Sequence, residues 1–330
     1  MADLDRVSIR RREMLALSVG TLIPWGTIAQ AQQAGQSWPA RQVEIVVPYP
    51  AGGTIDVPVR IIAERMARLS GFPMVVINSP GAGGVLAARN LLRSPADGYK
   101  IVATGAALPV SAILRQPPPY DPKADFTHVA RVTTAPHAIV VAVDSPLKTI
   151  HDLVSAAKSA PLMYGSPGVG TATHIFMESL AARAGTRFEH VAYKGAGPAM
   201  TDLTGGHIAA AAVGVSFAKA FVAAGKHRLL AVTSPSRLKE YPSTPTVSES
   251  YSELHDETWI AFTVQSGVPR EIVLQISSVV KAALADPEVQ SSLRNVGQEP
   301  AYLPVDEVSA MVDERAIQYR QTIARANIKL

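Results

Sequence analysis

The sequence predicts an α/β fold in which buried strands are each followed by a glycine turn and a helix. Val43–Val47 is a short β-branched run cut off by prolines, which is typical of a buried strand. After the glycines that follow it, apolar residues recur through Val59, Ile62 and Met66 at spacings of three and four, as on one face of a helix. Apolar residues make up 47% of the chain but aromatic residues only 6%, which suits strands covered by helices.

Length, charge and cysteine content restrict the possible functions. At 330 residues the chain is long enough for one large domain or for two lobes of about 100 to 150 residues. The formal net charge of +4 comes partly from the N-terminus, and no basic strip interleaved with aromatic residues follows it, so we expect no nucleic-acid partner. The absence of cysteine excludes a disulfide framework, a thiolate zinc site and a cysteine nucleophile.

Residues 1–31 are predicted to be an export signal. Three arginines, Arg10–Arg12, precede an apolar stretch over residues 15–28, and Ala29–Ala31 has the small-x-small pattern of a cleavage site. The stretch contains two glycines and a proline and is too short for a comfortable membrane span of about 20 residues. Arg11–Leu15 resembles a twin-arginine signal, and an ordinary secretory signal is the alternative. We expect cleavage after Ala31 and a periplasmic protein.

The first part of the mature chain repeats the order strand, turn and helix. Strands are predicted at 43–47, 74–77 and 100–104, with glycines after each and a helix over 85–92. Such repeats indicate a parallel sheet with right-handed crossovers, whose ligand lies outside the carboxyl ends of the strands. The three turns should therefore lie along one edge.

A second lobe is predicted after a proline-rich surface connection over 114–125. Two apolar segments, 126–132 and 138–143, are expected to carry the chain across, and 259–264 to carry it back. The predicted lobes are 37–135 with 262–330, and 136–261. Within the second lobe we expect further strands and helices at 150–159, 162–165, 188–191, 208–213, 217–224 and 229–233, and a helix that ends at Ala184. The C-terminal helices, 272–284, 287–295 and 305–326, are expected to pack on the first lobe.

Two glycine turns are candidates for an anion site. Ala51–Thr54 follows the first strand, and Ser166–His174 opens a helix of the second lobe with Thr171 or Thr173 as its N-cap. Free N–H groups and the positive end of the helix dipole converge at such a turn. Hydroxyls accompany both turns, and cationic side chains are few. We therefore predict a carboxylate ligand; the alternative is that the glycines only form tight connections.

Asp56 and Lys194 each allow two interpretations. A carboxylate next to an anion site repels the ligand, so Asp56 is either the N-cap of the first helix, which we favour, or an acceptor for a ligand hydroxyl, ammonium or bridging water. Lys194 is either solvated or meets a second carboxylate of the ligand.

Other site types fit the sequence less well. Gly81–Gly83 follows a strand, but Leu86 occupies the place of the third glycine in a dinucleotide fingerprint. Gly165–Gly168 is one residue short of a nucleophile elbow. No two histidines have the spacing of a helical zinc site, and His174 is interpreted as a structural donor. We expect no cofactor, no metal and no enzymatic activity.

Many motifs occur in an order that resembles one known family. They are Trp38-Pro39, Ile45–Val57, Pro80–Gly84, Ala96–Tyr99, Tyr120–Pro122, Gly168–His174, Tyr193–Gly195, Pro198–Leu203, Gly205-Gly206, Ala231–Ser234 and Pro245–Val247. Across the whole mature chain the sequence resembles the Bug, or tripartite tricarboxylate transporter receptor, family.

The resemblance implies a monomeric periplasmic solute-binding protein of the two-lobed, type II-like α/β class, with two crossing segments as a hinge. It implies capture of a small mono- or dicarboxylate between the lobes and delivery to a tripartite tricarboxylate-type permease. It implies that Ala51–Thr54 with Asp56 and Ser166–Thr173 grip one carboxylate. The full set of candidate ligand-binding residues is Tyr49, Ala51, Gly52, Gly53, Thr54, Asp56, Thr104, Ser166, Gly168, Val169, Gly170, Thr171, Thr173, His174 and Lys194. The alternatives are a ligand sensor for a signalling partner and an exported hydrolase using Ser166 or His174.

Overall fold

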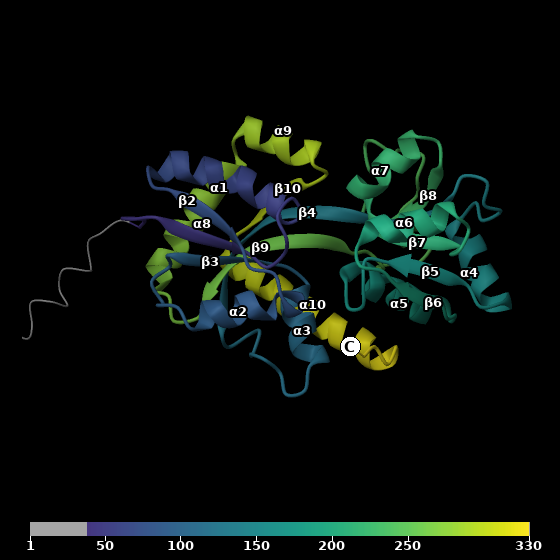
Figure 1. Ribbon diagram of the computed structural model, residues 1–330, viewed down its shortest axis with the longest axis horizontal. Helices are drawn as coiled ribbons and strands as arrows, with labels where there is room; N and C mark the ends of the chain where they lie inside the picture. The colour runs from purple at the N-terminus through teal and green to yellow at the C-terminus, as the bar shows by residue number, and fades with distance from the viewer. Residues whose placement is uncertain (1–37, 330) are drawn as a thin grey trace, which may run out of the picture. The chain divides into compact units, whose positions relative to one another are not determined.

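The computed structural model describes residues 38–329, so the predicted export signal lies outside the described residues. Strands and helices alternate along the chain (Figure 1). The strands are β1 (Val43–Val47), β2 (Met74–Asn78), β3 (Lys100–Thr104), β4 (Phe126–Ala142), β5 (Met163–Ser166), β6 (Glu189–Ala192), β7 (Ala210–Gly214), β8 (His227–Val232), β9 (Glu257–Gln265) and β10 (Glu299–Leu303).

Helices lie in the connections between these strands, and α10 follows the last strand. They are α1 (Asp56–Ser70), α2 (Val85–Leu92), α3 (Ala107–Leu114), α4 (Ile150–Ser159), α5 (Ala172–Ala184), α6 (Ala196–Thr204), α7 (Val215–Ala223), α8 (Arg270–Leu284), α9 (Pro287–Asn295) and α10 (Val305–Arg325), with short 3-10 helices η1 (Ala82–Gly84) and η2 (Val247–Glu249). The predicted α/β fold is confirmed. The helix α3 and the strand β10 were not predicted.

Two sets of parallel strands lie on either side of a central antiparallel pair. The strand order is β2-β1-β3-β9-β4-β7-β5-β6, and β8 and β10 also pair with β4. Strand β1 is parallel to β2 and β3, and β5 is parallel to β6 and β7. Because helices follow all six of these strands, the turns that begin them lie at the carboxyl edges, as predicted for the first set.

The two apolar segments predicted at 126–132 and 138–143 are parts of one strand, because β4 is continuous over 17 residues. Residues Phe126–Pro136 pair with β9, and His137–Ala142 pair with β7 and β8. The polar residues between the two apolar segments are buried and bonded: Thr133 donates to Gln298 at 2.9 Å, and the His137 N–H donates to Thr233 at 3.0 Å. The chain therefore crosses between the two strand sets inside a continuous strand.

Separate hydrophobic cores lie on the two faces of each strand set. On the first set, one core joins α1, α8 and α9 to the sheet around Ile45 and Phe262, and another lies under α2 and α3. On the second set, one core lies under α4 and α5 around Tyr164, and the other under α6 and α7 around Met200. The division into two lobes at the predicted bounds stays a prediction.

Helix α10 packs on more of the molecule than predicted. Its Val308 and Val312 pack on Trp259 and Ala261 of β9, as expected for a helix of the first lobe. Farther along, its residues Tyr319 and Ile323 form a small cluster with Val110 of α3 and Ile175 of α5. The helix thus contacts helices that follow both strand sets. Within residues 38–329, no helix combines the length and the apolar character that crossing a membrane requires.

Candidate functional site

The first glycine turn is held by a buried carboxylate behind it. Gly52 has a φ of +76°, a conformation that glycine adopts at little cost. The Gly52 N–H donates to Asp56 Oδ2 at 2.8 Å, and Arg60 Nε donates to the same oxygen at 3.0 Å. Asn78 Nδ2, at the end of β2, donates to Asp56 Oδ1 at 2.8 Å. Both oxygens of the Asp56 carboxylate therefore accept from the protein itself.

The favoured interpretation of Asp56 as the helix N-cap is wrong. Ile55 holds the N-cap position without a side-chain bond, and Asp56 is the first residue of α1, with 1% of its surface exposed. Burial alone would raise the pKa of this carboxyl, but the hydrogen bonds from Arg60, Gly52 and Asn78 outweigh it and lower the pKa. The ionised Asp56 carboxylate therefore holds the first turn in place and does not cap the helix.

The other candidates in and near the first turn differ in how exposed they are. Ala51, Gly52 and Thr54 are exposed, and the Thr54 carbonyl accepts from Gln298 at 3.4 Å. Tyr49 is partly buried, and burial raises its pKa to about 12. Thr104 is buried, with its hydroxyl bonded to Thr263 Oγ1 at 2.7 Å on β9. That hydroxyl bond leaves Thr104 as a support of the sheet edge.

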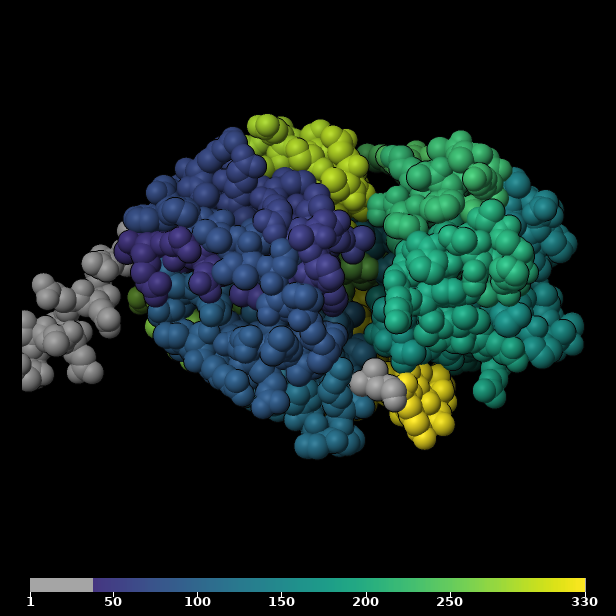
Figure 2. Space-filling model, in the orientation of Figure 1, coloured from purple at the N-terminus to yellow at the C-terminus, as the bar shows by residue number. Residues whose placement is uncertain are grey.

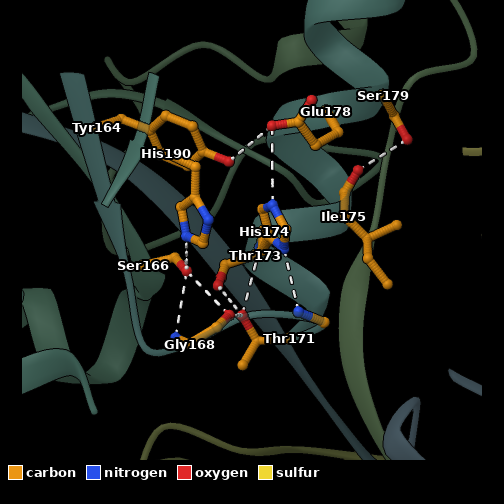
Figure 3. A network of polar contacts seen from close by, with 11 residues as sticks. Tyr164, Ser166, Gly168, Thr171, Thr173, His174, Ile175, Glu178, Ser179 and His190 are labelled. Atoms are coloured by element: carbon orange, nitrogen blue, oxygen red, sulfur yellow. Dashed lines mark hydrogen bonds and ion pairs between the residues drawn. The ribbon is translucent and has the colours of Figure 1, made fainter. Parts of the chain in front are cut away.

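The second turn contains a denser polar network (Figure 3). Ser166 is fully buried at the end of β5, and its Oγ accepts from the Gly168 N–H at 3.2 Å. Thr171 is the N-cap of α5, as predicted: its hydroxyl accepts from the His174 N–H at 3.4 Å and donates to the Gly168 carbonyl at 2.8 Å. Thr173 Oγ1 lies 3.2 Å from Thr171 Oγ1.

Two histidines back the second turn, and only one of them was a predicted site residue. The Gly170 N–H donates to His174 Nδ1 at 3.0 Å, and Ser166 Oγ lies 2.7 Å from His190 Nε2 (Figure 3). The two rings are stacked, with centroids 3.8 Å apart and planes 14° from parallel. His190 was missed because nothing in the sequence shows that β6 pairs with β5. Only the register of that pair, which places His190 beside Tyr164, identifies His190 as part of the site.

Several N–H groups that sequence reasoning assigned to the ligand are already used. Those of Gly52, Gly168 and Gly170 donate to side chains of the protein. Within residues 38–329, the N–H groups of Gly53, Thr54 and Val169 donate to no protein acceptor. Fewer backbone donors are therefore free at these turns than predicted, and the other three fix the shape of the turns.

Helices that begin at the carboxyl edges mostly lack side-chain caps. Five of the six that follow parallel strands have none, namely α1, α2, α3, α6 and α7. By contrast, α4 and α9 begin elsewhere and are capped by Thr149 and Asp286. Uncapped first turns leave backbone donors and a partial positive charge at these edges, which suits an anionic ligand.

The second turn lies against a helix that follows the first strand set. A methyl group added at Gly170 would come within 3.1 Å of Leu114 and 3.3 Å of Val110, both in α3. Figure 2 shows a groove between the surface of the purple-to-blue residues and that of the teal-to-green residues. Lys194 is exposed.

A cavity of about 820 Å³ lies behind the second turn, between α5, β6 and the end of α10. His174, Glu178 and His190 line it from one side, and Arg325 and Lys329 from the other. A second cavity of about 540 Å³ lies between α5 and α10. Val169 and His174 of the second turn line the first cavity, but Ala51–Thr54 of the first turn line neither cavity. Among residues 38–329, no group of three or more histidine and acidic side chains is arranged to hold a metal ion.

The comparisons with known proteins show which family the fold and the turns represent. The fold is that of α/β periplasmic binding proteins. Residues 59–328 match the tripartite tricarboxylate transporter family receptor, and the chain belongs to that family, which is one of solute-binding receptors. A UPF0065 protein of Bordetella bronchiseptica is 32% identical over 99% of this chain and 94% of its own. BugT of Bordetella pertussis is 27% identical over 94% of this chain and 97% of its own.

Solved structures agree with this assignment. A TctC solute-binding protein from Polaromonas superposes with a TM-score of 0.78 at 28% identity, covering 87% of this chain and 99% of its own. Rpa4515 of R. palustris, solved with adipate, superposes with a TM-score of 0.77 at 29% identity, covering 88% of this chain and 99% of its own. The resemblance stated from the motifs is thereby confirmed.

Proposed function

We propose that this protein is a periplasmic receptor that captures a small organic mono- or dicarboxylate between two lobes. The observation that carries the proposal is the pair of preformed glycine turns at the carboxyl edges of β1 and β5, ordered from behind by Asp56 and by the Ser166–His190 and Gly170–His174 bonds. Neutral backbone and hydroxyl donors bind a carboxylate without the desolvation cost of a buried cation. Adipate in the related Rpa4515 supports this ligand class.

We propose further that the ligand is passed to a tripartite tricarboxylate-type permease of the inner membrane, because the family is defined as the receptor of such transporters. Closure would bring ligand contacts from both lobes together, so that the ligand stabilises the closed state by its differential affinity. The predicted boundaries, 37–135 with 262–330 and 136–261, are part of this proposal.

A hydrolase is the less favoured function. Ser166 has no exposed surface, and its hydroxyl is already within bonding distance of His190 Nε2 and the Gly168 N–H and carbonyl. A nucleophile has to reach its substrate. We therefore assign Ser166 and His174 to the support of the turn and not to a reaction.

Calorimetric titration tests the proposed ligand class. The panel comprises adipate, succinate, glutarate, malate and benzoate, with glucose as a neutral control. We expect at least one acid to bind with one site per chain and glucose not to bind. Binding of glucose with no response to any acid would overturn the proposal. Capture of a permease subunit from bacterial membranes by the ligand-loaded protein would test the partner.

A further inference from the structure

The Gly170 bond determines which proton His174 carries. Because the Gly170 N–H donates to Nδ1 at 3.0 Å, Nδ1 must be an acceptor, and in a neutral imidazole the proton is then on Nε2. Nε2 lies 3.8 Å from Glu178 Oε1, one turn farther along α5. With 5% of its surface exposed, the ring has little freedom to turn away. The structure thus presents a single neutral tautomer whose unprotonated nitrogen points into the turn.

The turn is attached to the imidazole pair at two points. His174 holds the Gly170 N–H, and the ring stacked on it, His190, lies 2.7 Å from Ser166 Oγ, which itself holds the Gly168 N–H (Figure 3). Val169 lies between the two attached glycines, 41% exposed, and its N–H donates to no acceptor within residues 38–329. The direction of the Val169 N–H therefore depends on both attachments.

Burial, and not a charged neighbour, keeps His174 neutral. Glu178 on its own helix accepts from the Tyr164 hydroxyl of β5 at 3.2 Å, and burial raises the pKa of Glu178 against the effects of Tyr164 and Arg187. His190 faces it from β6, and Glu189, Arg325 and Lys329 line the cavity beside it. Burial, reinforced by His190, lowers the pKa of His174 to about 3, and burial lowers that of His190 to about 4.

We propose that His174 is a positioning residue of the carboxylate site: its Nδ1 holds the Gly170 N–H and thereby aims the free Val169 N–H at the ligand. The inference rests on the proposed function, because it assigns His174 to the turn that would grip the carboxylate. It differs from a direct ligand contact, since the imidazole acts through Gly170. It also differs from a packing role, since it requires an acceptor at the Nδ1 position.

Two substitutions separate the acceptor from the rest of the side chain. In His174→Asn, the amide oxygen takes nearly the position of Nδ1, whereas in His174→Gln the oxygen lies one bond farther out. Both remove the ring stack with His190, so that loss is matched. His151→Gln, on the exposed side of α4, is the control for the substitution itself. The readouts are the hydrogen-exchange protection of the Gly170 amide and calorimetric titration with the acids of the panel.

We expect His174→Gln to lower the protection of the Gly170 amide and to weaken acid binding about 5- to 10-fold, the loss of one hydrogen bond. His174→Asn should retain the protection and stay within about twofold of the unmodified protein. Equal effects of both variants, or unchanged Gly170 protection in His174→Gln, would overturn the inference. If no acid of the panel binds the unmodified protein, the proposed function fails, while the exchange data still decide whether His174 holds the turn.

Discussion

Asp56 is a buried carboxylate whose donors come from three parts of the chain: the turn at Gly52, the helix at Arg60 and the strand end at Asn78. A buried ion is tolerated only when such donors compensate for its lost hydration. The same bonds that satisfy the charge fix the first turn. The hydrogen bonds that compensate Asp56 for its lost hydration are thus the ones that shape the candidate site.

Replacing Asp56 should therefore cost more than replacing an exposed acid. Asp56→Ala leaves the Gly52, Arg60 and Asn78 donors without their acceptor, and we expect a loss of about 1 to 3 kcal/mol in the free energy of unfolding, together with weaker acid binding. Glu64→Ala breaks only the exposed pair with Arg68 on the same helix and should cost less than about 1 kcal/mol. Urea unfolding checks both, and equal losses would contradict this account of the turn.

Buried histidines predict how stability depends on pH. Burial lowers the pKa of His128 and His137 to about 4, below the usual value of about 6.5 in an unfolded chain. The unfolded state then binds more protons than the folded state. The contribution of the two histidines to the free energy of unfolding is therefore fully present above about pH 6.5 and is lost as the pH drops toward 4. Asp256 opposes this between pH 6 and 4, because burial raises its pKa to about 6 despite Arg315.

Urea unfolding at pH 7.5 and pH 5 measures the net effect. Each of the two histidines contributes up to about 3 kcal/mol, of which about 2 kcal/mol is lost by pH 5, so we expect the protein to be less stable at pH 5. The variant His128→Asn removes one titrating ring and should make the dependence shallower. Equal free energies of unfolding at the two pH values, together with no change in the dependence in His128→Asn, would contradict the predicted role of these rings.

Individual elements were predictable where their signals are local. The bounds of α4 and α9 agree with the sequence prediction, since each begins at a capping residue, Thr149 or Asp286, that acts on its own first turn. The two glycine turns were predictable for the same reason. The roles of their backbone N–H groups were not, because the acceptors at Asp56 and His174 could be recognised only once the side chains were placed.

Elements that depend on distant partners were missed. The continuous β4 contains Thr133 and His137, which look like a break until Gln298 and Thr233 supply their hydrogen bonds. Strand β10 exists because it pairs with β4 across more than 160 residues of chain. Pairing of this kind leaves no trace in local periodicity. Local patterns therefore identified the fold class and the apolar segments of the crossing, but neither the continuity of β4 nor the strand β10.

Gly297, between α9 and β10, lies against the start of α7. It has a φ of +73°, and a methyl group there would be 2.0 Å from Ser216 Cβ. Gly206 has the same φ of +73° and open space around it. We expect Gly297→Ala to lower the free energy of unfolding by at least about 1 kcal/mol more than Gly206→Ala, as measured by urea unfolding. Adding Ser216→Gly should recover part of the difference, and no recovery would contradict a steric cause.

At the scale of the whole molecule, the cores of the two strand sets are separate, and the cluster of Val110, Ile175, Tyr319 and Ile323 joins helices from both. Small contacts of this kind hold two bodies together less firmly than a shared core does. This arrangement is consistent with lobes that change their relative position when a ligand binds, as proposed.

Fluorescence energy transfer tests that proposal. The chain has no cysteine, so Glu64→Cys in α1 and Thr201→Cys in α6, both exposed, introduce two unique labelling sites. Because the ligand would favour the closed state, we expect saturating acid from the panel to raise the transfer efficiency. The same pair in the His174→Gln background should need about 5- to 10-fold more acid for half the change. An efficiency that acid leaves unchanged would contradict closure.

The paired β4 and β9 make the connection between the two strand sets a hydrogen-bonded ribbon and not two loose tethers. Their ladder runs from Phe126 opposite Gln265 to Pro136 opposite Glu257, with register shifts at two places. Irregularities of this kind are where a ladder bends and twists most easily. A rotation of one strand set against the other must therefore twist this ribbon. The resistance to that rotation would then be set by the residues of β4 and β9, away from the proposed carboxylate site.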